Sequence, residues 1–259
     1  MNGIPSLADW KPAADLLAGR PILLTGAAYG IGRAVSDAMA RHGATVIMLD
    51  KDVHGLEKAY ADIVAAGHTE PALYPMDLQG ASPDDYTQLA TTVLEAFGRL
   101  DALVHNAAYL GALVPFANYD NELWLQSVQV NLHAPYLLTR ACLGLLNAAD
   151  DASVLFVTDA AGRHGTAYWG AYAVSKAGQE CFMQILADEL EANTAIRVNS
   201  IDPGPVLTGM YRIAYPGIDS AGLRRPADIV NPFLYLCSAE SRDLQGRQLK
   251  LTDLLELAE

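Results

Sequence analysis

Short apolar runs alternate with longer amphipathic stretches along almost the whole chain. The apolar runs predict buried strands over residues 21–25, 45–50, 71–76, 102–105, 153–157, 196–201 and 248–251. The stretches between them carry apolar residues at helical spacing and predict helices over 33–42, 53–66, 83–97, 120–146, 172–190 and 226–238. Strands that alternate with helices imply an α/β fold, a parallel sheet with helices on both faces.

The chain shows no internal repeat, low-complexity run or linker, and its 259 residues suit one α/β domain. We therefore expect a single domain over residues 1–259. Residues 1–18 form a peripheral lead-in, in which Trp10, Leu16 and Leu17 can pack on the body. The long helix predicted over 120–146 contains Pro135, which can kink it.

Composition narrows the location and the partners. No apolar run approaches the roughly 18 residues of a membrane span, and residues 1–11 do not resemble a secretory signal. The three cysteines are far apart and fit no metal spacing, so we expect reduced thiols, no metal and a cytoplasmic protein. The net charge of −13 argues against nucleic acid or an anionic membrane as a partner.

Three glycines follow the first predicted strand, and a helix begins directly after them. Their spacing is Gly26-x-x-x-Gly30-x-Gly32, which differs from the general Gly-x-Gly-x-x-Gly fingerprint. Glycines at this place allow a tight turn and a close approach to a pyrophosphate, and the helix start supplies free N–H groups. The alternative is a glycine-rich turn without a ligand.

An acid ends the second predicted strand and bears on the choice of nucleotide. Asp50 lies eighteen residues beyond Gly32, near the separation expected for an acid that binds a ribose. Such a carboxylate repels a 2′-phosphate, so NAD is preferred over NADP. Lys51 and Arg33 could instead meet a 2′-phosphate, and Asp50 could be a simple strand-end cap.

Tyr172 and Lys176 lie four residues apart on a predicted helix and share one face. An ammonium group beside a phenol stabilises the phenolate and lowers the phenol pKa toward neutrality. The pair can then give or take a proton in redox chemistry at an alcohol or ketone. Taken alone, this spacing is also typical of a solvated helix face.

The sequence Thr25-Gly26-x-x-x-Gly30-Ile31-Gly32, together with Tyr172-x-x-x-Lys176, resembles the short-chain dehydrogenase/reductase family. Segments 162–165 and 169–172 resemble its YciK-like bacterial subgroup. The resemblance runs from about residue 20 to residue 251. It implies a single Rossmann-type doubly wound parallel sheet of about seven strands, a nicotinamide cofactor and a small-molecule substrate.

The resemblance also implies a role for individual residues. Tyr172 would be the catalytic acid/base, Lys176 would bind the ribose hydroxyls and lower the tyrosine pKa, and Asn131 would hold a water in the proton relay. The remaining cofactor-binding residues implied are Thr25, Gly26, Tyr29, Gly30, Ile31, Gly32, Asp50, Lys51, Asp77, Leu78, Asn106, Ala107, Pro203, Gly204, Val206 and Thr208.

Four of these residues have simpler structural explanations. Asn131 could bend or cap its helix, and Asn106 could be a strand-end turn residue. Asp77 could be a turn acid. Thr208 could be a helix N-cap.

The family pattern breaks at one position. The family serine lies three residues before Gly162 and thirteen before Tyr172, and both counts arrive at Asp159. Asp159 could be protonated and donate a hydrogen bond, or ionised and paired with the substrate, Lys176 or Arg163. It could also leave the protein with little activity, or lie outside the site if the strand register is shifted. Thr158 could replace the serine only if the strand end is bulged.

Residues 205–225 correspond to the variable loop that covers the substrate in the family. Met210, Tyr211, Ile213, Tyr215 and Pro216 offer an apolar lining, and Arg212, Arg224 and Arg225 could meet an anionic group or lie on the surface. The helices with Leu137-Leu138 and Phe182-Met183 resemble the family's dimerising pair, which implies a homodimer or homotetramer.

Two functions follow from these observations. The first is an NAD(P)-dependent oxidoreductase that transfers a hydride between a nicotinamide and a secondary alcohol or ketone, with Asp159 in place of the serine. The alternative is a cofactor-binding protein of the same fold, with little or no dehydrogenase activity and a sensing or interaction role. Tyr172, Lys176 and Asn131 favour the enzyme, and Asp159 favours the alternative.

Overall fold

The computed structural model describes residues 6–255 and contains one parallel sheet in order β3-β2-β1-β4-β5-β6-β7. Its seven strands are β1 (Pro21–Thr25), β2 (Thr45–Asp50), β3 (Ala72–Pro75), β4 (Ala102–His105), β5 (Ala152–Val157), β6 (Ile196–Asp202) and β7 (Gln248–Lys250). This is the predicted Rossmann-type sheet. The strand order reverses between β1 and β4, where such sheets bind their ligands.

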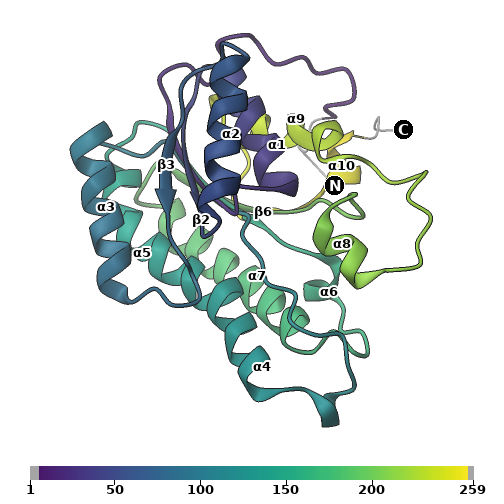
Figure 1. The fold of residues 1–259 in the computed structure, drawn as a ribbon. Helices are drawn as coiled ribbons and strands as arrows, with labels where there is room; N and C mark the ends of the chain where they lie inside the picture. The colour runs from purple at the N-terminus through teal and green to yellow at the C-terminus, as the bar shows by residue number, and fades with distance from the viewer. Residues whose placement is uncertain (1–5, 256–259) are drawn as a thin grey trace.

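Helices cover both faces of the sheet (Figure 1). One face carries α1 (Gly30–Arg41), α2 (Val53–Ala65) and α9 (Val230–Leu236). The other carries α3 (Pro83–Phe97), α5 (Ala134–Asn147) and α7 (Gly170–Glu191), with α4 (Asn121–Val128) against α7. The short helices α6 (Ala160–Arg163) and α8 (Gly209–Ala214) follow β5 and β6, and α10 (Leu251–Leu255) follows β7.

The two faces of the sheet hold separate hydrophobic cores. Along β1, Ile22 and Leu24 pack with α1 and α9, whereas Leu23 packs with the opposite core. Successive side chains on a strand point to opposite faces, so both neighbours are buried. This explains why the strands appear in the sequence as continuous apolar runs rather than as alternating patterns.

The helix predicted over residues 120–146 is three segments. A π-helical stretch, Gln129–His133, separates α4 from α5 just before Pro135. The helix predicted over 226–238 also differs, since it begins as a 3₁₀ turn at Pro226–Ile229 and α9 ends at Leu236. Helices α6 and α8 lie in segments predicted as loops; both are too short for a periodic apolar pattern to develop.

The described part of the lead-in packs beside the end of the chain. The backbone N–H of Leu7 donates to the carbonyl of Leu254, and the Trp10 indole donates to Glu240 at 2.8 Å. Leu17 is completely buried, so the described part of the lead-in, residues 6–18, packs on the body. Residues 1–5 lie outside the described part. Among the described helices, none is long and apolar enough to cross a membrane.

Candidate active site

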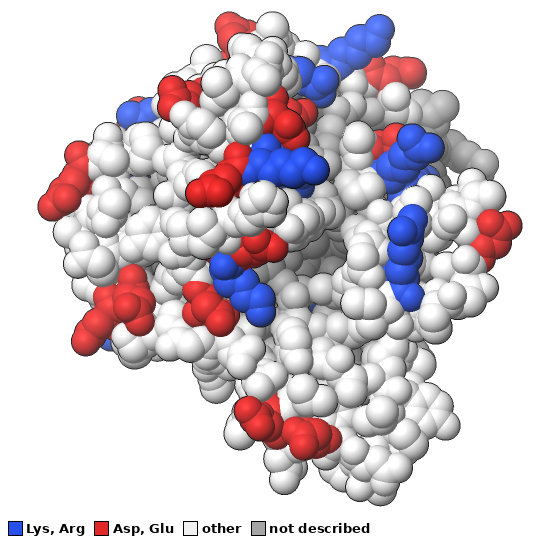
Figure 2. Space-filling view, in the orientation of Figure 1, with Lys and Arg blue, Asp and Glu red and all other residues white. Residues whose placement is uncertain are grey.

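A cavity of about 730 Å³ opens at the carboxyl edge of the sheet, where the strand order reverses. Figure 2 shows the surface hollowed near the centre of the view, beside α8. The cavity brings together most of the predicted site residues: Gly26, Tyr29, Gly30, Ile31, Asp50, Asn106, Ala107, Asp159, Tyr172, Lys176, Pro203, Gly204, Val206 and Thr208. Thr25, Gly32, Lys51, Asp77, Leu78 and Asn131 do not line it.

The glycine-rich turn at the start of α1 is held by very close backbone packing. A Cβ atom at Gly32 would lie 2.1 Å from the carbonyl oxygen of Gly26, and one at Gly26 would lie 2.8 Å from the Cα of Ala107. Gly30 has a positive φ of 56° and lines the cavity, and a Cβ there would make an ordinary contact with the Thr208 side chain at 3.5 Å. The glycines therefore shape the turn, and they leave its outer side accessible.

Thr25 and Asn106 fasten this turn to the end of β4. The Thr25 hydroxyl accepts the N–H groups of Asn106 and Ala107, each at 3.1 Å. The Asn106 amide donates to the carbonyls of Thr25 (3.0 Å) and Gly26 (3.1 Å). Asn106 is thus a strand-end turn residue and a cavity-lining residue at once, whereas Thr25 lies buried beneath the cavity floor.

Asp50 lines the cavity from the tip of β2. Its two carboxylate oxygens accept the N–H groups of Ala28 and Asp52, both at 3.1 Å. Lys51 is exposed, and Arg33 forms an ion pair with Asp62 at 2.7 Å. Asp50 therefore supports the glycine-rich turn and places a carboxylate in the cavity wall beside it.

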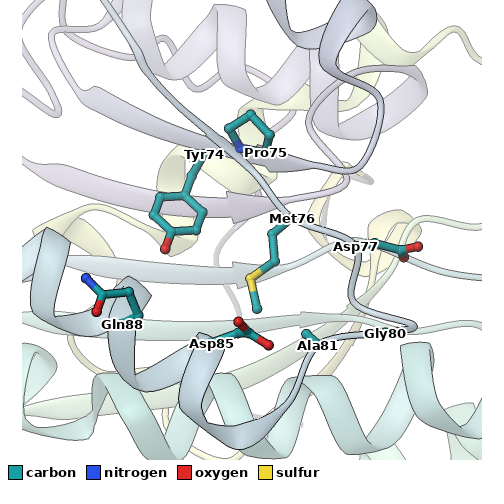
Figure 3. Close-up of a pocket in the computed structure, with 8 residues that line it drawn as sticks. All are labelled: Tyr74, Pro75, Met76, Asp77, Gly80, Ala81, Asp85 and Gln88. Atoms are coloured by element: carbon teal, nitrogen blue, oxygen red, sulfur yellow. The ribbon is translucent and has the colours of Figure 1, made fainter.

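Asp77 and Leu78 stand apart from the main cavity. The Asp77 carboxylate accepts the N–H of Gln79 at 3.0 Å, as a turn acid does, and Leu78 is buried. Asp77 lines a separate pocket of about 450 Å³, in which its side chain points away from Tyr74 and Gln88 (Figure 3). The structure thus does not bring these two residues to the main cavity.

Tyr172 is buried at the cavity wall and faces Asp159. Its phenol donates a hydrogen bond to the Asp159 carboxylate at 3.2 Å. Burial raises the pKa of Tyr172 well above its usual value, and the negative charge of Asp159 raises it further. The structure does not reproduce the expected fall in this pKa, because the phenol is buried and because an acid, not an ammonium group, is hydrogen-bonded to it.

Lys176 lies under the Tyr172 ring and is also buried. Its ammonium is 5.8 Å from the ring centroid and donates to the Val157 carbonyl at 2.8 Å and to the Gln179 side chain at 3.0 Å. Burial lowers the pKa of Lys176 to about 8.

Asn131 occupies the centre of the π-helical stretch and is completely buried. Its side chain accepts the N–H of Tyr109 at 2.7 Å and donates to the carbonyl of Tyr109 at 2.9 Å. It also donates to the hydroxyls of Ser127 and Ser175, and Ser175 lies on α7 between Tyr172 and Lys176. Asn131 therefore joins the loop after β4 to α7, and the helix is bent around it, as π-helical turns at functional sites often are.

Asp159 lies two residues after β5 ends at Val157, and it lines the cavity, so the register is not shifted and Asp159 is inside the site. Its carboxylate also accepts the Ala161 N–H at 2.8 Å and caps α6. Within residues 6–255 no hydrogen bond joins it to Lys176 or Arg163; instead Arg163 pairs with Glu180 at 2.8 Å. Thr158 is buried with its hydroxyl near Arg163, so it does not replace the serine beside Tyr172.

Aromatic rings line the other end of the cavity. The Trp169 ring lies 5.7 Å from that of Tyr172 and 5.9 Å from that of Tyr215, and Tyr211 and Tyr215 are 4.7 Å apart. Met210, Tyr211, Ile213 and Tyr215 line the cavity as predicted, whereas Pro216, Arg212, Arg224 and Arg225 do not. Thr208 caps α8 by accepting the N–H of Tyr211 at 3.1 Å.

Asp202 is a site residue that the sequence reasoning missed. It ends β6, lines the cavity and is 6% exposed. Burial raises its pKa, and Asp159 raises it further. The sequence contains a feature that could have predicted this, because Asp202 directly precedes the Pro203-Gly204 segment at the end of a predicted strand.

Comparisons with known proteins agree with this geometry. The family model described as short chain dehydrogenase matches residues 20–216. The chain is 39% identical to an uncharacterized oxidoreductase, YciK, of Escherichia coli K12, over 92% of this chain and 93% of that protein. It is 30% identical to a cyclopentanol dehydrogenase of a Comamonas species, over 88% and 93% of the two chains.

A solved structure extends the likeness to the whole fold. A short chain dehydrogenase from Shigella flexneri, complexed with NADP, is 38% identical, covers 93% of this chain and 100% of its own, and superposes with a TM-score of 0.90. The region matched by the family model, residues 20–216, contains the glycine-rich turn, Asn131, Asp159, Tyr172 and Lys176. The chain therefore belongs to the short-chain dehydrogenase/reductase family of oxidoreductases, in its YciK-like subgroup.

Proposed function

We propose that this protein interconverts a secondary alcohol and the corresponding ketone with a nicotinamide nucleotide as hydride carrier. The observation that carries the proposal is the placement of Tyr172 and Lys176 in the wall of one cavity that also reaches the glycine-rich turn. The Comamonas relative, named for a secondary alcohol, is consistent with this substrate class.

The glycine-rich turn fits the phosphates of such a nucleotide. Helix α1 begins at Gly30 with no side-chain cap from Tyr29 and no acid in its first turn. Its first N–H groups therefore have no side-chain acceptor of their own, and they carry the partial positive charge of a helix start. Asp50 and Lys176 would hold ribose hydroxyls, and Pro203, Gly204, Val206 and Thr208 would hold the nicotinamide end. When bound, the nucleotide supplies the hydride.

The chain's own residues supply the proton. A phenol with a raised pKa stays protonated near neutral pH, so Tyr172 carries the proton that a ketone oxygen takes up during reduction. The Lys176 ammonium below the ring then stabilises the phenolate that remains. Asp159 takes the position of the family serine and orients the phenol through its hydrogen bond. Exchange of Tyr172 for Phe is expected to remove turnover while nucleotide binding persists.

We further propose that NAD is the preferred nucleotide. Asp50 places a carboxylate at the ribose position, where it would repel a 2′-phosphate. Two observations support a preference for NADP instead: Lys51 is exposed beside Asp50, and the Shigella relative was solved in complex with NADP. Separate titrations with NADH and NADPH decide the matter, and tighter NADPH binding overturns the proposal. The matched variant Lys51→Ala should weaken NADPH binding alone.

A nucleotide-binding protein with little dehydrogenase activity is the second candidate. The observation in its favour is the Asp159–Tyr172 contact, since the acid opposes formation of the phenolate that alcohol oxidation needs. A panel of alcohols and carbonyl compounds should be assayed with the native protein and with Asp159→Ser. Activity that arises only in the variant supports the second candidate, whereas a native activity that the variant loses excludes it.

We also propose that the protein assembles as a homodimer or homotetramer through the outer faces of α5 and α7. Tyr136 on α5 is 46% exposed and lies 6.0 Å from Phe182 on α7, and Ile185 on α7 is 52% exposed. Large apolar side chains exposed together are typical of interfaces. Closed symmetry is the usual solution for such a self-complementary face.

A further inference from the structure

The substrate end of the cavity carries an excess of negative charge. Among the described residues, the charged side chains that line the cavity are Asp50, Asp159, Lys176 and Asp202. Asp50 is at the nucleotide end, which leaves two acids and one ammonium near the reacting centre. Lys176 donates to Val157 and Gln179, so it does not form an ion pair with Asp159. The arginines of the covering loop lie outside the cavity.

The aromatic wall adds a second, independent preference for positive charge. Trp169, Tyr172, Tyr211 and Tyr215 line the same end, with neighbouring ring centroids 4.7 to 5.9 Å apart. The faces of such rings attract cations, and the attraction strengthens when the cation is desolvated. A ligand with an anionic group would find no lining arginine to receive it, whereas an ammonium group would meet an acid and several rings.

The distance between Asp159 and Tyr172 limits where that ammonium lies relative to the reacting hydroxyl. The carboxylate oxygen and the phenol oxygen are 3.2 Å apart. Two polar groups on neighbouring carbons of a ligand match this spacing, so such a ligand can contact the carboxylate and the phenol at once. An ammonium held by Asp159 also neutralises the carboxylate that would otherwise repel an alkoxide forming at Tyr172.

Resting on the function proposed above, we propose that the substrate is a vicinal amino alcohol or the corresponding amino ketone, with its protonated nitrogen bound by Asp159. Asp202 and the aromatic wall complete the cation site. Tyr172 contacts the hydroxyl or carbonyl oxygen. In this arrangement the carboxylate at the serine position is a specificity-determining group, and the site selects amino alcohols over plain alcohols and diols.

Binding tests this without relying on turnover. Protein saturated with NADH or NADPH is titrated with 2-aminocyclohexanol, 1,2-cyclohexanediol, cyclohexanol and cyclohexylamine, and the ligand-dependent rise in melting temperature is followed. The amino alcohol should bind about tenfold or more tightly than the diol, as expected for one charge-assisted hydrogen bond. Asp159→Asn and Asp159→Ser should remove that preference, and both retain a side chain that caps α6.

Asp188→Asn is the matched control, because it makes the same charge change on an exposed position of α7. It should leave the preference intact. Equal binding of the diol and the amino alcohol, or a preference that survives in Asp159→Asn, overturns the inference. Cyclohexylamine binding as tightly as the amino alcohol also overturns it, since the nitrogen would then occupy the Tyr172 position. Nucleotide binding with no amine binding refutes this inference alone and leaves the proposed function standing.

Discussion

Lys176 is a cation in a fully buried position, and the fold bears a cost for it. Burial lowers its pKa from 10.5 to about 8, although it has two hydrogen-bond acceptors, the Val157 carbonyl and the Gln179 side chain. Such a cost is characteristic of functional sites, where charge is retained for chemistry rather than for stability. The consequence can be measured through the pH dependence of unfolding.

Replacing Lys176 by Met should change stability in a pH-dependent way. Below about pH 8 Lys176 is protonated both folded and unfolded, so the full cost of its buried charge, about 3 kcal/mol, is present. Between about pH 8 and 10.5 the unfolded chain binds more protons, so native stability rises with pH relative to the variant. Above that range the difference is constant.

Denaturant unfolding of both proteins at several pH values measures this difference. The part of the difference in unfolding free energy that does not vary with pH reports the hydrogen bonds that Met cannot make. Only its slope with pH reports the charge of Lys176. A difference that stays flat from pH 7 to pH 10.5 would contradict the assignment of a lowered pKa to Lys176.

At the scale of elements, the π-helical stretch between α4 and α5 depends on a single side chain. Asn131→Ala removes the amide that holds Tyr109, Ser127 and Ser175 together, and it leaves the N–H of Tyr109 without its partner, whereas the Tyr109 carbonyl keeps the Ser127 hydroxyl at 3.2 Å. An unpaired buried polar group costs about 1–3 kcal/mol, so we expect a loss of roughly 1–3 kcal/mol. Denaturant unfolding checks this, and Asn147→Ala at the exposed end of α5 serves as the control.

The close packing of the turn between β1 and α1 predicts that a substitution at Gly32 impairs both nucleotide binding and stability. In Gly32→Ala the new methyl group would overlap the Gly26 carbonyl, which lies 2.1 Å from the ideal Cβ position, so the turn must open. We expect nucleotide binding to fall by at least tenfold, together with a lower melting temperature. Gly80→Ala, where a Cβ meets no atom within 4 Å, should change neither property. Wild-type nucleotide affinity in Gly32→Ala would show that the turn does not contact the phosphates.

Most of the regular helices and strands could be predicted from the sequence, because they are determined by residues close together along the chain. The strand over residues 21–25 and the helix over 83–97 have the predicted bounds, since both rest on apolar spacing and clear end signals. Helices α6 and α8 could not be predicted, because each depends on one capping side chain, Asp159 or Thr208. The break at Gln129–His133 arises from hydrogen bonds to Tyr109 and Ser175, which no local pattern contains.

The same reason explains which parts of the site were predicted. The glycine-rich turn, Tyr172 and Lys176 are spaced within single elements, and the cavity gathers them. The raised pKa of Tyr172 depends on its burial and on the orientation of Asp159, which are tertiary properties. The expectation from the Tyr-Lys spacing therefore failed for the pKa although it identified the residues.

At the scale of the whole molecule, the proposed assembly rests on the outer faces of α5 and α7. Ile185→Glu places a charge on this apolar surface and should shift the protein toward the monomer. Sedimentation equilibrium over a range of concentrations measures the shift. Leu94→Glu on α3, where Leu94 is 55% exposed, is the control and should leave the association unchanged. If Ile185→Glu sediments as the wild type does, the assembly uses another surface.

The cap that Asp159 provides for α6 has a consequence for how this site can evolve. The cap needs only an acceptor oxygen, and Ser, Asn and Asp supply one about equally well. Position 159 can therefore exchange a neutral hydroxyl for a full negative charge with little change in folding free energy. A lineage can alter the charge presented to its substrate here by substitution of this one residue, without first acquiring a compensating change elsewhere.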